Sequence, residues 1–167
     1  EQLIKEKINE HLIPFVYCNL VGAQDELIFD GNSLAYNKSG ELICSGKSFS
    51  EDLVIVDLNS SEKYDISPKD RALNMYSALC LGVKDYFKKT GHQKAVLGLS
   101  GGIDSSLTAC IAVDALGKEN VLGISMPSSY SSEHSITDAE KLAQNLGTSF
   151  HTIAIKKIVH ATMQSLE

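Results

Sequence analysis

The segment from Ala95 to Ala109, AVLGLSGGIDSSLTA, constrains the fold more than any other part of the sequence. An apolar run leads into a glycine pair flanked by serines, and an apolar helical pattern follows at once. Glycines let the backbone turn sharply and leave no side chains in the way of an anion. The first N–H groups of a helix have no intrahelical partner and carry the positive end of the helix dipole. A strand, a tight turn and a helix in this order predict a phosphate-binding loop.

The residues on either side of this segment alternate between helical and strand patterns. Apolar residues recur three and four positions apart from Arg71 to Gly91, which predicts an amphipathic helix. The elements predicted after the glycine pair are a helix ending at Gly117, a strand over 120–127, a helix from Ser132 to Gly147 and a strand over 149–155. Strands joined by helices through short links pair in parallel with right-handed crossovers. This half of the chain predicts an α/β domain.

The first sixty or so residues show a helical start and then a strand-rich pattern. Residues 12–21 predict a buried strand, residues 22–33 a polar loop, and Asn37–Gly40 a hairpin turn between two short strands. Residues 51–59 predict one more apolar strand. A polar stretch with Pro68 and no periodicity then marks a boundary. We therefore expect one domain over 1–64, a linker over 65–71 and a second domain over 72–167.

Composition excludes several classes of protein. With 43% hydrophobic and 22% charged residues, the 167-residue chain has the makeup of a globular protein. A net charge of −6 argues against a general nucleic-acid surface. No apolar run approaches the roughly 20 residues of a membrane helix. The four cysteines form no C-x-x-C pair, which argues against a zinc site and a disulfide framework and favours reduced thiols in a cytoplasmic protein. Both ends cut through helical patterns, so we expect a piece of a longer protein.

The loop from Ser100 to Ser106, SGGIDSS, departs from two familiar phosphate-binding motifs. It has no lysine, as G-x-x-x-x-G-K-[ST] requires, and it does not match G-x-G-x-x-G. The hydroxyls of Ser100, Ser105 and Ser106 are possible donors to phosphate oxygens. Asp104 would repel a phosphate unless a cation lies between them, and a Mg²⁺ held by Asp104 and phosphate oxygens resolves that conflict. The alternative is that Asp104 only caps the helix.

The sequence S-G-G-[hydrophobic]-D-S-[S/T] after a strand resembles the signature of the N-type ATP pyrophosphatases, or PP-loop enzymes. A longer stretch, from YSALCLGVKDYF through SGGIDSS and MPSSYSSEHS to DAEKLAQNLG, is similar to the synthetase domain of glutamine-dependent NAD⁺ synthetases. FVYCNLVGAQDELIFDGNSLAYNKSGELI resembles the C-terminal part of the nitrilase-like glutaminase domain of that family. The resemblance implies a Rossmann-like parallel sheet, of the adenine nucleotide alpha-hydrolase type, preceded by a β-rich piece of a nitrilase-like α/β sandwich.

The resemblance also implies a reaction. The nicotinate carboxylate of deamido-NAD attacks the α-phosphate of ATP, pyrophosphate leaves, and ammonia from glutamine then displaces AMP to give NAD⁺. By this resemblance Ser100, Gly101, Gly102, Ile103, Asp104, Ser105 and Ser106 hold ATP and its pyrophosphate, and Asp104 binds Mg²⁺. Gly98, Leu99 and Met126 are expected to shape the adenosine pocket, with the turn from Met126 to Ser132. The family further implies a homo-oligomer that passes ammonia between two sites.

Other polar residues carry weaker expectations. His134 and Asp138 fit helix support or the surface better than catalysis. A nitrilase-like glutaminase uses a Glu-Lys-Cys triad, but Cys18 lies in an apolar pattern with no activating lysine nearby, so we expect it in the core. Gln24, Asp25 and Glu26 match a family loop near the glutamine pocket, or a simple turn.

Several alternatives stay open. Another adenylating PP-loop enzyme (GMP synthetase-like or tRNA-modifying) shares the loop, although its glutamine-donating domain would be of another class. A nitrilase-type amidase lacks its triad here, and a non-catalytic nucleotide-binding module also fits. We expect neither active site to be complete within these 167 residues.

Overall fold

The computed structural model describes residues 2–65, 70–129 and 131–166. The chain forms two compact units, Glu1–Gly82 and Val83–Glu167, whose boundary lies inside a long helix, α2 (Arg71–Thr90). Each unit is considered by itself below. Among the described residues, none of the helices has both the length and the apolar character needed to cross a bilayer.

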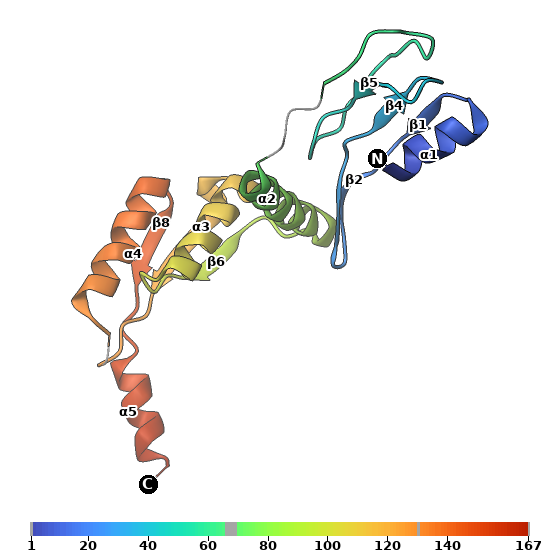
Figure 1. The fold of residues 1–167 in the computed structure, drawn as a ribbon. Helices are drawn as coiled ribbons and strands as arrows, with labels where there is room; N and C mark the ends of the chain where they lie inside the picture. The colour runs from blue at the N-terminus through green and yellow to red at the C-terminus, as the bar shows by residue number, and fades with distance from the viewer. Residues whose placement is uncertain (1, 66–69, 130, 167) are drawn as a thin grey trace. The chain divides into compact units, whose positions relative to one another are not determined.

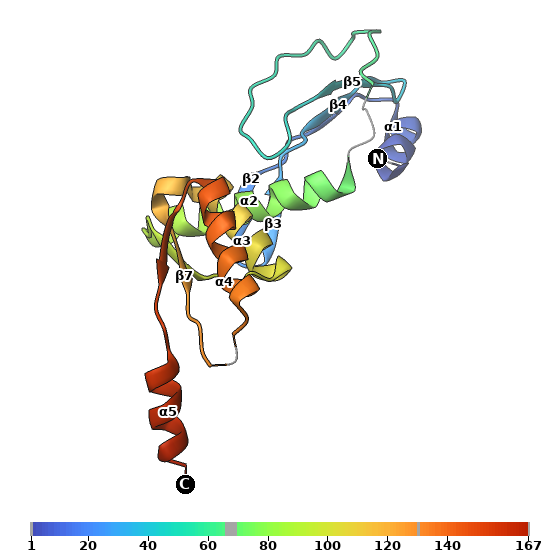
Figure 2. The same ribbon diagram turned by 90° about the vertical axis from the view of Figure 1, so that its left-hand side faces the viewer.

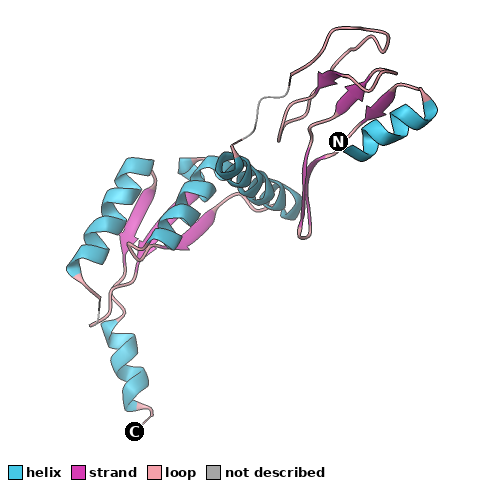
Figure 3. Cartoon of the chain, viewed as in Figure 1, coloured by secondary structure: helices cyan, strands magenta, loops and turns pink. Residues whose placement is uncertain are grey.

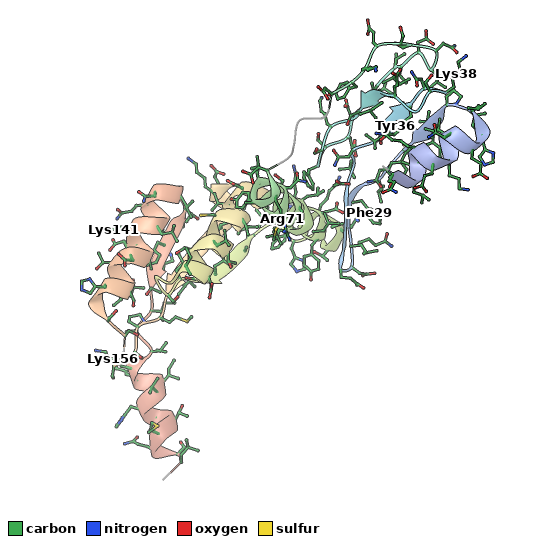
Figure 4. The ribbon with its side chains drawn as sticks, in the orientation of Figure 1. Phe29, Tyr36, Lys38, Arg71, Lys141 and Lys156 are labelled. Atoms are coloured by element: carbon green, nitrogen blue, oxygen red, sulfur yellow. The ribbon has the colours of Figure 1, made fainter. Side chains whose placement is uncertain are left out.

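The first unit contains a helix, a small antiparallel sheet and a separate hairpin (Figure 1). Strands β1, β4 and β5 form the sheet in that order, and β2 and β3 pair with each other. Ile8 of the helix and Tyr36 of β4, which is labelled in Figure 4, have the most deeply buried large side chains. The elements are α1 (Gln2–His11), β1 (Phe15–Tyr17), β2 (Val21–Gln24), β3 (Leu27–Asp30), β4 (Leu34–Tyr36) and β5 (Leu42–Ser45).

The predicted hairpin turn between β4 and β5 is confirmed. Asn37 N–H donates to the Glu41 carbonyl at 3.0 Å, and Gly40 takes the left-handed conformation with φ of 74°. The Asn37 side chain is buried and has four partners, because Oδ1 accepts from the N–H groups of Ser39 and Glu41 and Nδ2 donates to Glu41 Oε2 and the Ser60 carbonyl. The Asn37 side chain thus closes the turn and links Ser60 to it.

Four predictions for the first unit are wrong. Residues 12–21 form no single buried strand: β1 is three residues long, Val16 is 59% exposed, and Cys18 is exposed instead of lying in the core. The strand ends before Asn19, because the Asn19 side chain donates to Asp30 Oδ1 and to the Gly31 carbonyl. These bonds join the chain to the next turn instead of continuing the ladder.

Residues 22–33 were expected to be a loop but supply most of the β2–β3 hairpin, and residues 51–59 form no strand. The hairpin turn is Asp25–Glu26, with Asp25 at φ of 51°, a conformation that aspartate tolerates in tight turns. Leu53 and Ile55 are 89% and 94% exposed, so the apolar pattern there has no packing surface among the described residues of its unit. Whether an apolar segment forms a strand depends on such packing, so the apolar pattern of residues 51–59 alone gave a wrong prediction.

The second unit is the predicted layered α/β domain. Strands β6 (Ala95–Gly98), β7 (Val121–Ser125) and β8 (Ser149–Thr152) pair in parallel in that order. Helix α3 (Ile103–Leu116) packs on β6 and β7, α4 (Glu133–Leu146) packs on β7 and β8, and the two helices lie side by side (Figures 2 and 3). A short 3-10 turn, η1 (Lys118–Asn120), follows α3, and α5 (Lys156–Gln164) comes last. As predicted, α4 ends at Gly147, in the left-handed conformation.

The core of this unit lies between the sheet and the two helices. Small alanines on both helices, Ala109, Ala139 and Ala143, are almost fully buried beside Leu99, with larger side chains packed around them: Leu97, Leu142, Leu146 and Phe150. Alanines let the helices approach the sheet closely. Gly123 of β7 lies under Leu99, since a Cβ on Gly123 would meet Leu99 Cδ1 at 2.5 Å. This packing fixes Leu99, the residue just before the loop from Ser100 to Ser106, which we call the glycine loop.

Candidate nucleotide site

The glycine loop begins where β6 leaves the sheet. Leu99 is 2% exposed, and its N–H donates to the Ile124 carbonyl at 2.8 Å, which extends the strand pairing by one residue. The chain then turns at Ser100–Gly102 and enters α3 at Ile103. The loop therefore lies at the carboxyl end of a parallel strand, the edge at which open α/β sheets bind ligands.

The loop geometry requires glycine at position 101 and leaves the start of α3 uncapped at position 102. Gly101 has a φ of 78°, and a Cβ there would stand 2.5 Å from the Ser135 carbonyl oxygen. Gly102 is the N-cap of α3 with extended backbone, and no side chain caps this helix end. The N–H groups of the first helical turn consequently have no side-chain cap and remain available to an anion.

The three loop serines are brought together, but they bond mainly within the loop. The hydroxyls of Ser105 and Ser106 donate to the Gly102 carbonyl at 3.0 and 2.9 Å. Ser100 Oγ accepts from the Gly102 N–H at 3.3 Å and lies 3.1 Å from Ser105 Oγ. In this conformation the serines brace the turn, so backbone amides are the readiest donors toward a phosphate. Direct donation from the hydroxyls remains a prediction.

Asp104 is exposed in the first turn of α3. The alternative in which it is the helix cap is wrong, because Gly102 holds the N-cap position and no side chain accepts a bond there. A carboxylate in this position interacts favourably with the helix dipole. No cluster of three or more His, Cys, Asp or Glu residues suited to a metal occurs in the described part of the chain. The fit to Mg²⁺ is still good, because Mg²⁺ commonly binds one or two carboxylates together with substrate phosphates and water.

A pocket of about 540 Å³ opens beside the loop. The three residues predicted to shape an adenosine site, Gly98, Leu99 and Met126, all line it. The Met126 Cε lies 3.5 Å from the position of a Cβ on Gly98, so glycine keeps this wall open. Residues of β7, of α4 and of the connections after β6 and β7 complete the lining: Ser100, Ile124, Ser125, Pro127, Ser131, Ser132, Ser135 and Ile136. Its apolar and hydroxyl groups suit a flat aromatic ring joined to a sugar.

Sequence reasoning missed Ile124, Ser125, Ser135 and Ile136 as lining residues of this pocket. Ile124 and Ser125 belong to the apolar pattern of β7, and the other two resemble ordinary first-turn residues of a helix. The packing of α4 against β7 and against the loop after β6 brings these two elements together at the pocket. His134 and Asp138 are exposed on α4, as expected, and neither lines the pocket.

Comparisons with known proteins place the chain in a family. The NAD synthase family pattern matches residues 75–167. The chain is 51% identical to the glutamine-dependent NAD(+) synthetase of Synechocystis sp. over 99% of its length, which is 31% of that protein. It is 40% identical to the enzyme of Aquifex aeolicus over its whole length, which is 36% of that protein. The chain thus spans about a third of the curated relatives it matches.

A solved structure has a closely similar fold. The glutamine-dependent NAD⁺ synthetase of Acinetobacter baumannii, in complex with ADP, superposes with a TM-score of 0.91 at 39% identity, covering 99% of this chain and 32% of that one. The predicted α/β class with a Rossmann-like parallel sheet is confirmed. The family pattern covers more than half of the chain, including the glycine loop and the pocket. The chain is a member of the NAD synthase family.

Proposed function

We propose that the protein to which this chain belongs is a ligase that converts deamido-NAD to NAD⁺, using ATP and ammonia taken from glutamine. The observation that carries the proposal is the β6–loop–α3 turn, whose uncapped amides lie beside a pocket that Met126 and Leu99 line. Membership of the NAD synthase family supports the chemistry. The relatives named as glutamine-dependent enzymes support glutamine as the ammonia source.

The loop suits the leaving group of an adenylation. The nicotinate carboxylate oxygen bonds to the α-phosphorus of ATP, the bond to the bridging oxygen breaks, and pyrophosphate departs with the electron pair. The amide groups of Gly101 and of Ile103 to Ser105 then stabilise the charge that develops on pyrophosphate, whereas the Gly102 and Ser106 amides are bonded within the loop. A Mg²⁺ bound at Asp104 would neutralise the same charge. Ammonia next attacks the acyl carbon, AMP leaves, and a proton is lost to give the amide.

The adenosine of ATP would occupy the pocket beside the loop. Gly98 leaves room against Met126, while Leu99 and Ile136 offer apolar surface. Ser131 at the mouth is suited to hydrogen-bond polar atoms of the nucleotide, whereas the Ser132 hydroxyl is bonded to Ser135. This arrangement would direct the phosphates toward the uncapped end of α3.

We assign the first 64 residues to a nitrilase-like glutaminase domain, 65–71 to a linker and 72–167 to the synthetase domain. Cys18 is exposed, and no hydrogen bond joins it to a lysine among the described residues, so we give it no role as a nucleophile. Gln24, Asp25 and Glu26 form the end of the β2–β3 hairpin, a position that suits contact with a ligand or another segment. We further propose a cytoplasmic homo-oligomer that passes ammonia between its two sites.

Calorimetry of ATP binding tests the loop assignment. We expect the 167-residue chain to bind ATP in the presence of Mg²⁺, and Asp104→Ala to remove most of the Mg²⁺ dependence. Asp138 is another exposed aspartate, on a neighbouring helix. The variant Asp138→Ala is therefore the matched control and should bind ATP as the parent chain does. Equal binding with and without Mg²⁺ in both the parent chain and Asp104→Ala would overturn the role of Asp104. Absence of ATP binding to the parent chain would count against the site itself.

A further inference from the structure

The first turn of α4 packs directly on the glycine loop. A Cβ on Gly101 would meet three backbone atoms of Ser135: the carbonyl oxygen at 2.5 Å, Cα at 2.9 Å and the carbonyl carbon at 3.0 Å. Real Cβ atoms do not approach backbone so closely. The loop can therefore keep its shape only with glycine at this position and with the backbone of Ser135 held in place.

Ser132 holds that backbone. It is the N-cap of α4, and its Oγ accepts from the Ser135 N–H at 3.2 Å. The two hydroxyl oxygens of Ser132 and Ser135 also lie 2.8 Å apart. An N-cap bond fixes the first turn of a helix relative to the chain that enters it. The residue that Ser132 fixes is the same one that contacts Gly101.

We propose that Ser132 is a positioning residue for the glycine loop. Through Ser135 it sets where Gly101 lies, and Gly101 in turn sets the direction of the amides that start α3. Loss of the Ser132 hydroxyl would loosen the loop through Ser135, the residue that contacts Gly101. The consequence for ATP rests on the proposed function, whereas the mechanical link between the two turns does not.

Hydrogen exchange on the ligand-free chain tests the link. Ser132→Ala removes the cap acceptor, and amides in residues 100–106 should exchange about fivefold faster. Ser132→Thr keeps the acceptor and should restore slow exchange. Ser132→Gly, a milder loss because glycine is tolerated at this position, should lie between the two. Asp70→Ala is the control: Asp70 Oδ1 accepts from the N–H groups of Ala72 and Leu73 at the start of α2, in the other unit. This variant should leave residues 100–106 unchanged.

ATP affinity provides the second measurement. With Mg²⁺ present, the Kd of Ser132→Ala should rise about fivefold, and that of Ser132→Thr should stay within about twofold of the parent value. Faster exchange confined to the first turn of α4 in Ser132→Ala would overturn the proposal. Faster exchange in residues 100–106 in a chain that binds no ATP would support the link between the two turns and count against the proposed function.

Discussion

The carbonyl oxygen of Ser135 lies 2.5 Å from the point where a Cβ on Gly101 would stand. Gly101 belongs to the loop after β6, and Ser135 to the first turn of α4, 34 positions later in the numbering. Two turns that the sequence separates thus form one packed structure. The shape of the candidate phosphate-binding loop depends on the second turn as much as on its own glycines.

Replacement of Gly101 by alanine should destabilise the second unit. Alanine is strained at a φ of 78°, and its Cβ would overlap backbone atoms that have no flexible end to move. Gly91 is the matched control, because its φ is 74° and a Cβ there would meet nothing within 4 Å. We expect Gly91→Ala to lower the free energy of unfolding by about 1 kcal/mol. Gly101→Ala should lower the free energy of unfolding by at least about 1 kcal/mol more than Gly91→Ala does. Urea unfolding checks both values, and equal losses would contradict the packing argument.

Asn37 should be the most sensitive residue of the β4–β5 turn. Alanine at this position would leave the N–H groups of Ser39 and Glu41 without their acceptor and would remove the two bonds of the buried Nδ2 group, at a cost of about 2 kcal/mol in the free energy of unfolding. Lys38→Ala removes an exposed side chain from the same turn and should change stability by less than about 0.5 kcal/mol. Urea midpoints of the two variants provide the comparison. Similar midpoints for both would show that the Asn37 bonds contribute little.

Acid should weaken the first unit through Glu41. Its hydrogen bonds, first to Lys63 and then to Asn37, lower the pKa of the carboxyl below its ordinary value of 4.5. A lowered pKa in the folded state means that this stabilisation is fully present above pH 4.5 and is lost as the pH falls through the lowered pKa. The free energy of unfolding of Glu41→Gln should therefore fall less on acidification than that of the parent chain. Urea midpoints measured across the acid range test this, with exposed Glu62→Gln as the charge control. Parallel curves for the parent chain and Glu41→Gln would contradict it.

The cysteines of the first unit should differ in reactivity. Burial, and then the nearby Asp52 carboxylate, raise the pKa of the Cys44 thiol, so less thiolate is present near neutral pH. Cys18 is exposed. Alkylation by iodoacetamide, followed by mass spectrometry, should modify Cys18 at least about tenfold faster than Cys44. In urea the two cysteines should be alkylated at similar rates. A rate difference that persists in urea would show that the neighbouring sequence, and not burial, sets the reactivity.

Much of the second unit follows from local rules. The apolar spacing of α3 and α4, the glycines that end them, and the short apolar runs between them predicted the order of elements and their parallel pairing. The glycine pair placed the loop correctly at the strand end. These features rest on contacts between residues close in sequence, so a single sequence contains them.

The first unit was harder to predict for the opposite reason. Whether residues 12–21 and 51–59 form strands depends on the surfaces available to them, and an apolar run carries no record of those surfaces. The β2–β3 hairpin was hidden because its polar turn and Gly22 resemble a loop. The exposure of Cys18 likewise depends on where β1 ends, which the Asn19 side chain decides through bonds to Asp30 and Gly31.

The sequence by itself determined the strand–loop–helix unit around Ser100–Ser106, because glycine conformations and helix starts are set by neighbouring residues. The tertiary structure alone decided that the Ser135 backbone contacts Gly101, and that Ser135 and Ile136 join Leu99 and Met126 in one pocket. Those approaches are produced by the packing of α3 and α4 on a common sheet through Leu99, Ala109, Ala139 and Ala143. Distances between residues far apart in the chain follow from that packing and from no local pattern.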